Sequence, residues 1–350
     1  MTILKPAKPL IATLAATLIL AACNGDGGNG EPASQPPAAG NPPTAGAVQT
    51  NGVNGAFSGK LFYEYAGEYI AFDLASGKPQ PYLQEDTNRY SFSISADGKA
   101  ALVGEQLTTG SREKEAVHRY LAVDTATGKT LGTYPGSPGS LSGMAMKLSP
   151  DGEYIATGLF RYQWGKAHIV VEDSNGNLLF DFTAAGFDDA FGWLPDGRMV
   201  AADANGWLTL FDRNFNQVKR IRQFSGPSLP SGVQASPDGG RLAFLWNDRI
   251  HVMNLDGSGL RQVTTSDLWQ SGAAWSPDGK YLVITEAGGG SAIYAQGSAP
   301  CPLLRIVSAD ESMVDVGYLS KDPRSYEVKG ATGRNGELLG VCARRVSWRN

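Results

Sequence analysis

The sequence predicts an all-β protein, a six-bladed β-propeller built from four-stranded antiparallel blades. Three observations carry this prediction. A motif of the Ser-Pro-Asp-Gly type recurs five times, an apolar run follows each copy, and glycine contributes 44 of the 350 residues. That glycine content is about 13%, against a usual ~7%, and it favours many tight turns between short strands.

The repeated motif has the chemistry of a tight turn. Its five copies are Ser95–Lys99, Ser149–Glu153, Leu194–Arg198, Ser236–Gly239 and Ser276–Lys280. In such a segment proline fixes one φ angle, aspartate bonds to the backbone two residues on, and glycine supplies a positive φ. Because an aspartate occurs in every copy, we interpret these aspartates as turn-capping residues rather than as metal ligands or catalytic acids.

Strand-like runs and a second turn complete each unit. The runs after the motif are Ala100–Val103, Tyr154–Thr157, Met199–Ala202, Arg241–Leu245 and Tyr281–Thr285. Further Asp-containing turns begin at Asp73, Asp124 and Asp173, with weaker copies at Asp212 and Asn254. Each unit therefore contains four short strands within 40 to 54 residues, the spacing between successive motif aspartates. Four strands in a repeat of ~40–45 residues are typical of a propeller blade.

The two ends of the repeat region complement each other. Gly59–Tyr65 resembles a second strand with no turn motif before it, whereas Val346–Arg349 resembles a first strand with none after it. Joined, they make one blade, so the C-terminal strand is predicted to complete the N-terminal blade. Such closure removes the free edges of an open sheet. First strands near Phe92, Met146, Phe191, Val233, Ala274 and Trp348 then give six blades.

These motifs resemble those of the TolB-type propeller family, whose WD40-like repeats read roughly Trp-Ser-Pro-Asp-Gly-Lys before an apolar strand. The resemblance covers Phe57 to Asn350, and of the tryptophans only Trp275 and Trp348 are matched to the family pattern. It implies the fold. TolB itself carries an additional α/β domain and is a soluble periplasmic protein, so its role with Tol–Pal partners is not carried over.

The first 22 residues have the features of an export signal. Lys5 and Lys8 precede an apolar run from Leu10 to Ala22, which is too short to span a bilayer but suits a signal-peptide core. The run ends in Leu-Ala-Ala-Cys23, which resembles the lipobox of bacterial lipoproteins. That resemblance implies cleavage before Cys23 and acylation of its thiol. Asn24, rather than Asp, indicates the outer membrane, with the protein facing the periplasm; an ordinary secretory signal is the alternative.

Residues 23–54 are predicted to form a disordered tether, and residues 55–350 the propeller, as a monomer. The segment after Cys23 contains mostly Gly, Pro, Ala, Asn and Gln, which bury too little apolar surface to fold. Cys301 and Cys342 remain as a pair in an oxidising compartment, and we predict that they form a disulfide. Two buried free thiols are the alternative.

The sequence contains few groups suited to catalysis. It has three histidines, no Gly-x-Ser-x-Gly motif and no phosphate-binding loop, and its net charge is −4. We therefore predict no cofactor, no metal, no enzymatic activity and no nucleic-acid partner, since phosphate binding requires a basic surface. Asp188 and Asp189 precede a first strand and could face the central channel, where a cation site or a catalytic carboxylate is the alternative to a solvated pair.

Binding is predicted on the face opposite the repeated turns. The loops of that face vary in length, and uneven insertions on one face of a repeat protein often mark its binding side. Trp, Tyr and Arg, which are enriched in binding hot spots, are frequent there. The predicted partner-binding residues are Arg89, Tyr90, Arg161, Tyr162, Trp164, Trp246, Asp248, Trp269, Gln270, Arg344 and Arg345, with Arg112 and Trp207 on the same face.

The predicted function is that of a membrane-anchored envelope lipoprotein, held by its acyl chains, whose propeller binds a protein or peptide. Two other classes stay open. One is a periplasmic propeller enzyme of lactonase or hydrolase type with a channel site. The other is a glycan- or small-ligand-binding protein that uses Trp and Tyr as stacking platforms.

Overall fold

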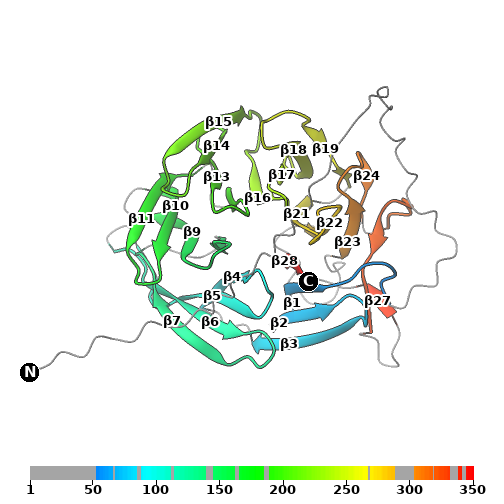
Figure 1. The fold of residues 1–350 in the computed structure, drawn as a ribbon, viewed down its shortest axis with the longest axis horizontal. Helices are drawn as coiled ribbons and strands as arrows, with labels where there is room; N and C mark the ends of the chain where they lie inside the picture. The colour runs from blue at the N-terminus through cyan, green and yellow to red at the C-terminus, as the bar shows by residue number, and fades with distance from the viewer. Residues whose placement is uncertain are drawn as a thin grey trace, which may run out of the picture. The chain divides into compact units, whose positions relative to one another are not determined.

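The protein folds as a ring of six β-sheet blades around a central axis (Figure 1). The computed structural model describes residues 53–65, 68–84, 88–111, 114–138, 145–161, 165–184, 189–266, 269–287, 303–317, 319–331, 338–340 and 344–350. These residues form strands and turns and no helix, so they include no helical segment that could cross a bilayer. The predicted fold class, a six-bladed propeller of four-stranded antiparallel blades, is confirmed.

The strands of each blade follow one another from the axis outward. Blade 1 contains β28 (Arg344–Arg349), β1 (Lys60–Tyr65), β2 (Glu68–Asp73) and β3 (Lys78–Gln84), and blade 2 contains β4 (Arg89–Ile94), β5 (Ala100–Gln106), β6 (His118–Asp124) and β7 (Thr130–Pro135). Blade 3 contains β8 (Met146–Leu148), β9 (Tyr154–Arg161), β10 (Lys166–Asp173) and β11 (Leu178–Thr183), and blade 4 contains β12 (Phe191–Trp193), β13 (Met199–Ala202), β14 (Trp207–Phe211) and β15 (Gln217–Gln223). Blade 5 contains β16 (Ser231–Ala235), β17 (Arg241–Trp246), β18 (Arg249–Asn254) and β19 (Arg261–Gln262), and blade 6 contains β21 (Trp269–Trp275), β22 (Tyr281–Ala287), β23 (Leu304–Ser308) and β25 (Tyr326–Glu327).

The repeated motif forms the turn between the first and second strand of a blade. In blade 2, Oγ of Ser95 donates to Oδ1 of Asp97 at 2.7 Å and accepts from the backbone N of Ala100 at 3.0 Å. Gly98 has a φ of +71°, a conformation that glycine adopts without a steric penalty. The Ser95 hydroxyl and the backbone N of Lys99 stabilise the ionised carboxylate and lower the pKa of Asp97. These contacts identify the aspartate as a turn-capping group.

Each neighbouring pair of blades encloses its own apolar cluster. Among the described residues, six clusters lie between neighbouring blades, one at each interface of the ring. The cluster between blades 6 and 1 contains Leu61, Phe72, Val283 and Trp348. The cluster between blades 2 and 3 is the smallest of the six, with four buried members. Apolar burial between flat blades therefore holds the ring together.

The C-terminal strand closes the ring as predicted. β28 pairs antiparallel with β1, with Trp348 opposite Leu61 and Arg349 opposite Lys60. Nε1 of Trp348 donates to the carbonyl of Ser58 at 2.9 Å, and the indole is 3% exposed. Arg349 extends this closure to blade 2, because its guanidinium donates to the carbonyl oxygens of Ile94 and Ser95.

A second contact between blades 1 and 6 comes from the N-terminal end of the described chain. Asn54 is fully buried, and its Nδ2 donates to the carbonyls of Leu74 at 2.9 Å and Lys329 at 2.8 Å. Its Oδ1 accepts from the backbone N of Lys329 at 2.8 Å. Val53 also donates to the carbonyl of Ala75. The contacts of the propeller therefore reach two residues into the segment predicted as tether.

Blade 6 carries short strands in addition to its four blade strands. β24 (Val314–Asp315) pairs in parallel with β20 (Thr264–Thr265), which follows the last strand of blade 5. A separate hairpin joins β26 (Lys329–Ala331) and β27 (Leu338–Gly340). Cys23, Cys301 and Cys342 lie outside the described residues, so their predicted acylation and pairing stay predictions.

Candidate binding site in the central channel

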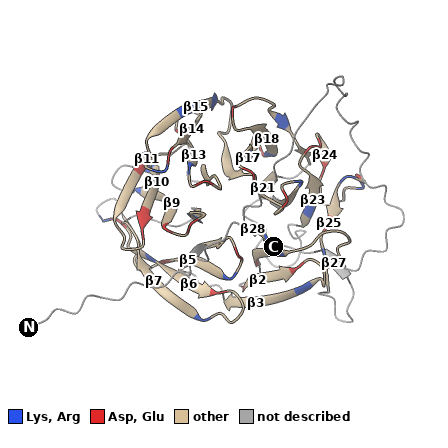
Figure 2. Ribbon diagram, in the orientation of Figure 1, with Lys and Arg blue, Asp and Glu red and all other residues tan. Residues whose placement is uncertain are grey.

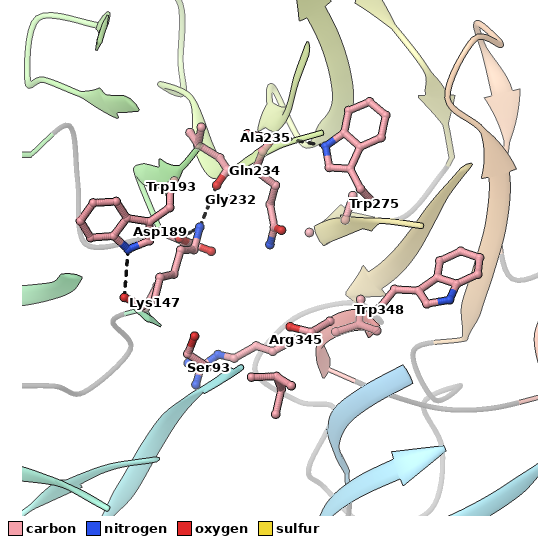
Figure 3. A pocket seen from close by; sticks show the side chains of 18 of the residues that line it. Ser93, Lys147, Asp189, Trp193, Gly232, Gln234, Ala235, Trp275, Arg345 and Trp348 are labelled. Atoms are coloured by element: carbon pink, nitrogen blue, oxygen red, sulfur yellow. Dashed lines mark hydrogen bonds and ion pairs between the residues drawn. The ribbon is translucent and has the colours of Figure 1, made fainter. Parts of the chain in front are cut away.

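A cavity of about 730 Å³ follows the axis of the propeller. Residues of all six inner strands line it: β4, β8, β12, β16, β21 and β28 (Figure 3). Inner strands are edge strands, so their backbone edges face the channel. The cavity is therefore a product of ring closure, and every blade contributes to its wall.

The two ends of the channel differ in chemistry. The repeated turns surround one end, here called the turn face, with Ala96, Pro150, Pro195, Pro237 and Pro277. The opposite end, here called the insertion face, is where the chain enters each inner strand. Toward it lie four of the five charged side chains of the described lining, those of Lys147, Asp189, Asp248 and Arg345, and the exposed indole of Trp269, whereas Arg349 lies at the turn face. Charged residues of both signs also occur on the outer strands of the blades (Figure 2). Within the channel, polar recognition is concentrated toward the insertion face.

Lys147 is a structural clamp in the channel wall. Its Nζ lies 2.6 Å from the carbonyl of Phe191, 2.7 Å from that of Val233 and 2.5 Å from Oδ1 of Asp189 (Figure 3). An ammonium has three donors, so these contacts use all of them. A Cβ on Gly192 would lie 2.5 Å from the Val233 carbonyl, which shows how closely β12 and β16 approach here. Lys147 thus connects blades 3, 4 and 5.

Tryptophans at the end of inner strands connect neighbouring blades in a related way. Nε1 of Trp193 donates to the carbonyl of Lys147 at 3.1 Å, and Nε1 of Trp275 donates to that of Gln234 at 3.2 Å. Trp193 directly precedes its turn motif, as Trp275 does, whereas no turn motif follows Trp348. The prediction that only Trp275 and Trp348 match the family pattern was therefore wrong. The match at Trp193 was missed because Leu194 stands where the family pattern has serine.

Arg345 lies at a β-bulge and has a positive φ angle. Tyr63 pairs with Val346 and Glu64 with Arg344, so Arg345 is the extra residue of a β-bulge. Its φ is +41°, a left-handed conformation that residues other than glycine rarely adopt. Nη1 of Arg345 lies 3.9 Å from Oε2 of Glu64, and its side chain is 42% exposed. Figure 3 shows this side chain in the channel, directed from β28 toward Ser93.

Bulges recur at the same level of the channel. The ladder between first and second strands also shifts register at Arg89/Ser91 in β4, at Ser231/Gln234 in β16 and at Gln270/Gly272 in β21. Four of the six inner strands are thus bulged near the insertion face. A bulge leaves one residue outside the ladder and redirects its side chain, and bulges are over-represented next to active sites.

Several residues predicted to bind a partner have structural roles instead. Arg161 is 9% exposed and donates to the carbonyl of Pro138, with Asp181 3.4 Å away. Gln270 is 2% exposed, and its Oε1 accepts from the backbone N of Ile250 at 2.9 Å and from the hydroxyl of Thr264. These two residues were predicted as binding groups because their spacing placed them near loops, but they hold strands together.

Other members of the predicted face are only partly available. Trp246 is half-buried, with its ring 5.0 Å from that of Phe224. Arg89 donates to the carbonyl of Gln84 and lies 3.6 Å from Glu105. Asp248 is exposed, at the tip of the two-residue turn between β17 and β18.

The remaining predicted residues include several whose side chains or whole residues lie outside the described part of the structure. Tyr162, Trp164, Asp188 and Arg112 lie outside the described residues, and of Tyr90 and Arg344 only the backbone is described. Trp207 is half-buried, with the guanidinium of Arg220 over its ring. Trp269, Asp248 and Arg345 are therefore the exposed, described members of the predicted face that also line the cavity.

The buried polar groups between blades 2 and 3 form a second cluster. The hydroxyl of Tyr120 lies 2.7 Å from Oε2 of Glu172, 2.9 Å from Oγ1 of Thr157 and 3.1 Å from Nε2 of His118. All four residues are buried, and burial raises the pKa of Tyr120 well above its usual range. A substrate cannot reach these atoms, so the cluster is a polar contact between blades.

Histidines do not line the channel in the described part of the protein. Nδ1 of His168 contacts Oδ1 of Asp181 at 2.6 Å on the outer strands of blade 3, and His251 packs beside Phe244 and Trp246. Burial lowers the pKa of His251. Among the described residues, no three His, Cys, Asp or Glu side chains are placed to hold a metal ion together.

Solved structures with the same architecture were found by comparison. TolB from Acinetobacter baumannii superposes with a TM-score of 0.57 at 17% sequence identity, covering 84% of this chain and 67% of that one. A putative TolB from Agrobacterium tumefaciens superposes with a TM-score of 0.50, also at 17% identity, covering 74% of this chain and 87% of that one. The chain has the TolB-type propeller fold. No protein-family model matches the sequence, and no curated protein is significantly similar to it.

The structural likeness therefore extends to the fold and confirms the architecture that the repeats predicted. At 17% identity it does not transfer a binding partner. Function in this TolB-type propeller has to be argued from its own channel.

Proposed function

We propose that this protein is an exported, lipid-anchored propeller that binds a protein or peptide partner at the insertion-face mouth of its channel. One observation carries the proposal. The channel is ringed by prolines and alanine at the turn face, where Arg349 is the one charged side chain among the described lining residues, whereas its exposed indole and its other charged side chains lie toward the insertion face. Ordered aromatic and arginine side chains around a concavity are typical of binding hot spots.

The identity of the exposed residues supports binding rather than packing. Trp269 is 59% exposed at the start of β21, although a tryptophan in a propeller can be buried, as Trp275 is at the other end of the same strand. An exposed indole at the rim of a cavity offers a large apolar surface at a low entropic cost. Arg345 adds a charged group from blade 1.

The N-terminal segment supports attachment to the envelope. In this proposal Cys23 carries the acyl chains, and the residues after it connect the propeller to the outer membrane on its periplasmic side. Several acyl chains anchor a protein far more firmly than one.

The alternative functions have less support in the channel. An enzyme of lactonase or hydrolase type would need catalytic groups from several blades. The carboxylate side chains among the described lining residues are Asp189 and Asp248, and Asp189 is paired with Lys147. A glycan-binding site would need a row of exposed aromatic rings, whereas Trp269 is the one large exposed aromatic side chain of the described residues.

The proposal can be tested by crosslinking and capture from envelope fractions. We expect Trp269→Ala to lose the partners that the wild-type protein captures, since it removes the aromatic surface at the mouth. Leu131→Ala is the matched control, because Leu131 on β7 is equally exposed at 59% and lies away from the channel. An unchanged set of captured partners in Trp269→Ala would rule out this face.

A further inference from the structure

We propose that the anchor holds the propeller with its turn face toward the membrane, so that the insertion face points away from the lipid and binds a water-soluble domain of the partner. This inference rests on the proposed function, in which the chain is anchored at Cys23, and it adds the side from which the partner binds. Three observations carry it: the point where the chain enters the ring, the contacts that fix this point and the length of the predicted tether.

The N-terminal segment enters the ring at the turn face. The turn between β2 and β3 lies on that face, because β2 runs in the same direction as the inner strand β28. In blade 2 the corresponding turn contacts the repeated turn directly, since the backbone N of Thr125 donates to the carbonyl of Lys99 at 2.9 Å. The backbone N of Val53 donates to the carbonyl of Ala75 in the β2–β3 turn at 2.7 Å. Val53 therefore lies at the end of the ring opposite to Trp269.

Buried contacts fix this entry point. Asn54 is fully buried, and its side chain bonds to the backbone of Leu74 and of Lys329. Val53 packs on Gly77, where a Cβ would lie 2.8 Å from Cγ1 of Val53. Gly77 has a φ of +67°, so both its conformation and the close approach of Val53 require glycine. The predicted tether therefore begins at a fixed point of the turn face.

The predicted tether is short enough for its point of attachment to matter. About 30 residues separate Cys23 from Val53, and a flexible linker of that length has an r.m.s. end-to-end distance of roughly 30 Å. The inner strand β21 crosses the ring with seven residues, which span about 23 Å at ~3.3 Å each. With the insertion face on the lipid, Val53 would lie farther from the membrane by about this thickness, which would use most of the span of the linker. Chain entropy therefore favours the turn face toward the membrane.

This orientation determines which partners can bind at the channel mouth. The exposed indole of Trp269 then points into the aqueous space beside the membrane. A protein domain in that space can approach the mouth along the channel axis without displacing lipid. A segment buried in the same bilayer would instead lie next to the turn face. We therefore expect the partner to present a water-soluble domain to the insertion face.

The test measures fluorescence energy transfer from the propeller to lipid vesicles. The acylated full-length protein is reconstituted into phosphatidylcholine vesicles with an acceptor dye on a fraction of the headgroups, and a fluorescent residue is introduced at position 280 or at position 269. Lys280, whose side chain is 74% exposed, marks the turn face, and Trp269 marks the insertion face. We expect at least about twofold more transfer from position 280, because the length of β21 separates the two positions and transfer falls steeply with distance.

Two variants separate the effect of the tether from other causes. Cys23→Ser should neither float with the vesicles nor transfer energy from either position, since it lacks the acylated thiol. A protein with the tether sequence duplicated should still float, but its two positions should give more similar transfer, because the r.m.s. span of the linker grows by about 1.4-fold. A difference that persists unchanged in this variant would overturn the inference, since adhesion of one face to lipid would then set the orientation.

The remaining outcomes distinguish this inference from the proposed function. Equal transfer from both positions of a protein that floats, or more transfer from position 269, would overturn the orientation and leave the anchor in place. A wild-type protein that does not float would contradict the anchor and the orientation together. Loss of partner capture in Trp269→Ala is measured separately and tests the binding face alone.

Discussion

Trp348→Ala is expected to lower the free energy of unfolding by about 3–5 kcal/mol, the usual cost of removing a buried tryptophan from a core. Trp348 is 3% exposed and belongs to the apolar cluster between blades 6 and 1. Its indole also bonds to the carbonyl of Ser58 at 2.9 Å, and a truncated side chain would leave that acceptor unpaired. Since native domains are stable by only ~5–15 kcal/mol, this loss is a large fraction of the total.

Urea unfolding followed by far-ultraviolet circular dichroism measures this effect. Trp269→Ala is the control of identical chemistry, because Trp269 is 59% exposed and its removal should change the unfolding free energy by less than ~0.5 kcal/mol. If both variants unfold at the wild-type urea concentration, the tail does not close the ring in solution.

Cys23→Ser is expected to move the protein from the membrane fraction to the soluble fraction. Each buried methylene of an acyl chain contributes ~0.8 kcal/mol to membrane binding, so loss of all chains removes the anchor completely. The reason is chemical: a serine hydroxyl does not replace the thiol to which the lipid is attached in lipoproteins of this type.

Metabolic labelling with a fatty-acid analogue and fractionation of cells measure the anchor. Cys301→Ser is the matched control and should keep both the label and the membrane location. Membrane retention of Cys23→Ser after washing with high salt would show that the protein is held there by something other than acylation.

Most of the fold could be predicted because it depends on local chemistry repeated five times. A Pro-Asp-Gly turn needs only neighbouring residues, so Asp97 and Asp238 could be assigned as turn caps from the sequence, and burial of apolar runs then follows. Ring closure was predictable for the same reason, since β1 and β28 each lack the strand that the other supplies.

The chemistry of the channel was less predictable because it depends on contacts between distant residues. Lys147 contacts Phe191, Asp189 and Val233, up to 86 positions away, and nothing in its local sequence indicates a clamp. Burial of Arg161 and Gln270 likewise follows from how the blades pack, which the local sequence does not indicate.

The backbone conformation of Arg345 also depends on residues that are distant in the sequence. Its sequence position at the start of a first strand predicted the insertion face, but the bulge that redirects it depends on the register between β28 and β1. Pairing register across a ring closure is set by the whole blade. The sequence alone therefore identified the residue without its conformation.

The account is tested most directly by photo-crosslinking from the two ends of one inner hairpin. Trp269 begins β21 at the insertion face, and Lys280, with its exposed side chain, lies in the turn after β21 at the turn face. With a photoreactive residue at each position in turn, we expect crosslinks to an envelope protein from position 269 and none from position 280. Crosslinks from position 280 alone, or equally from both, would contradict partner binding at the mouth of the channel.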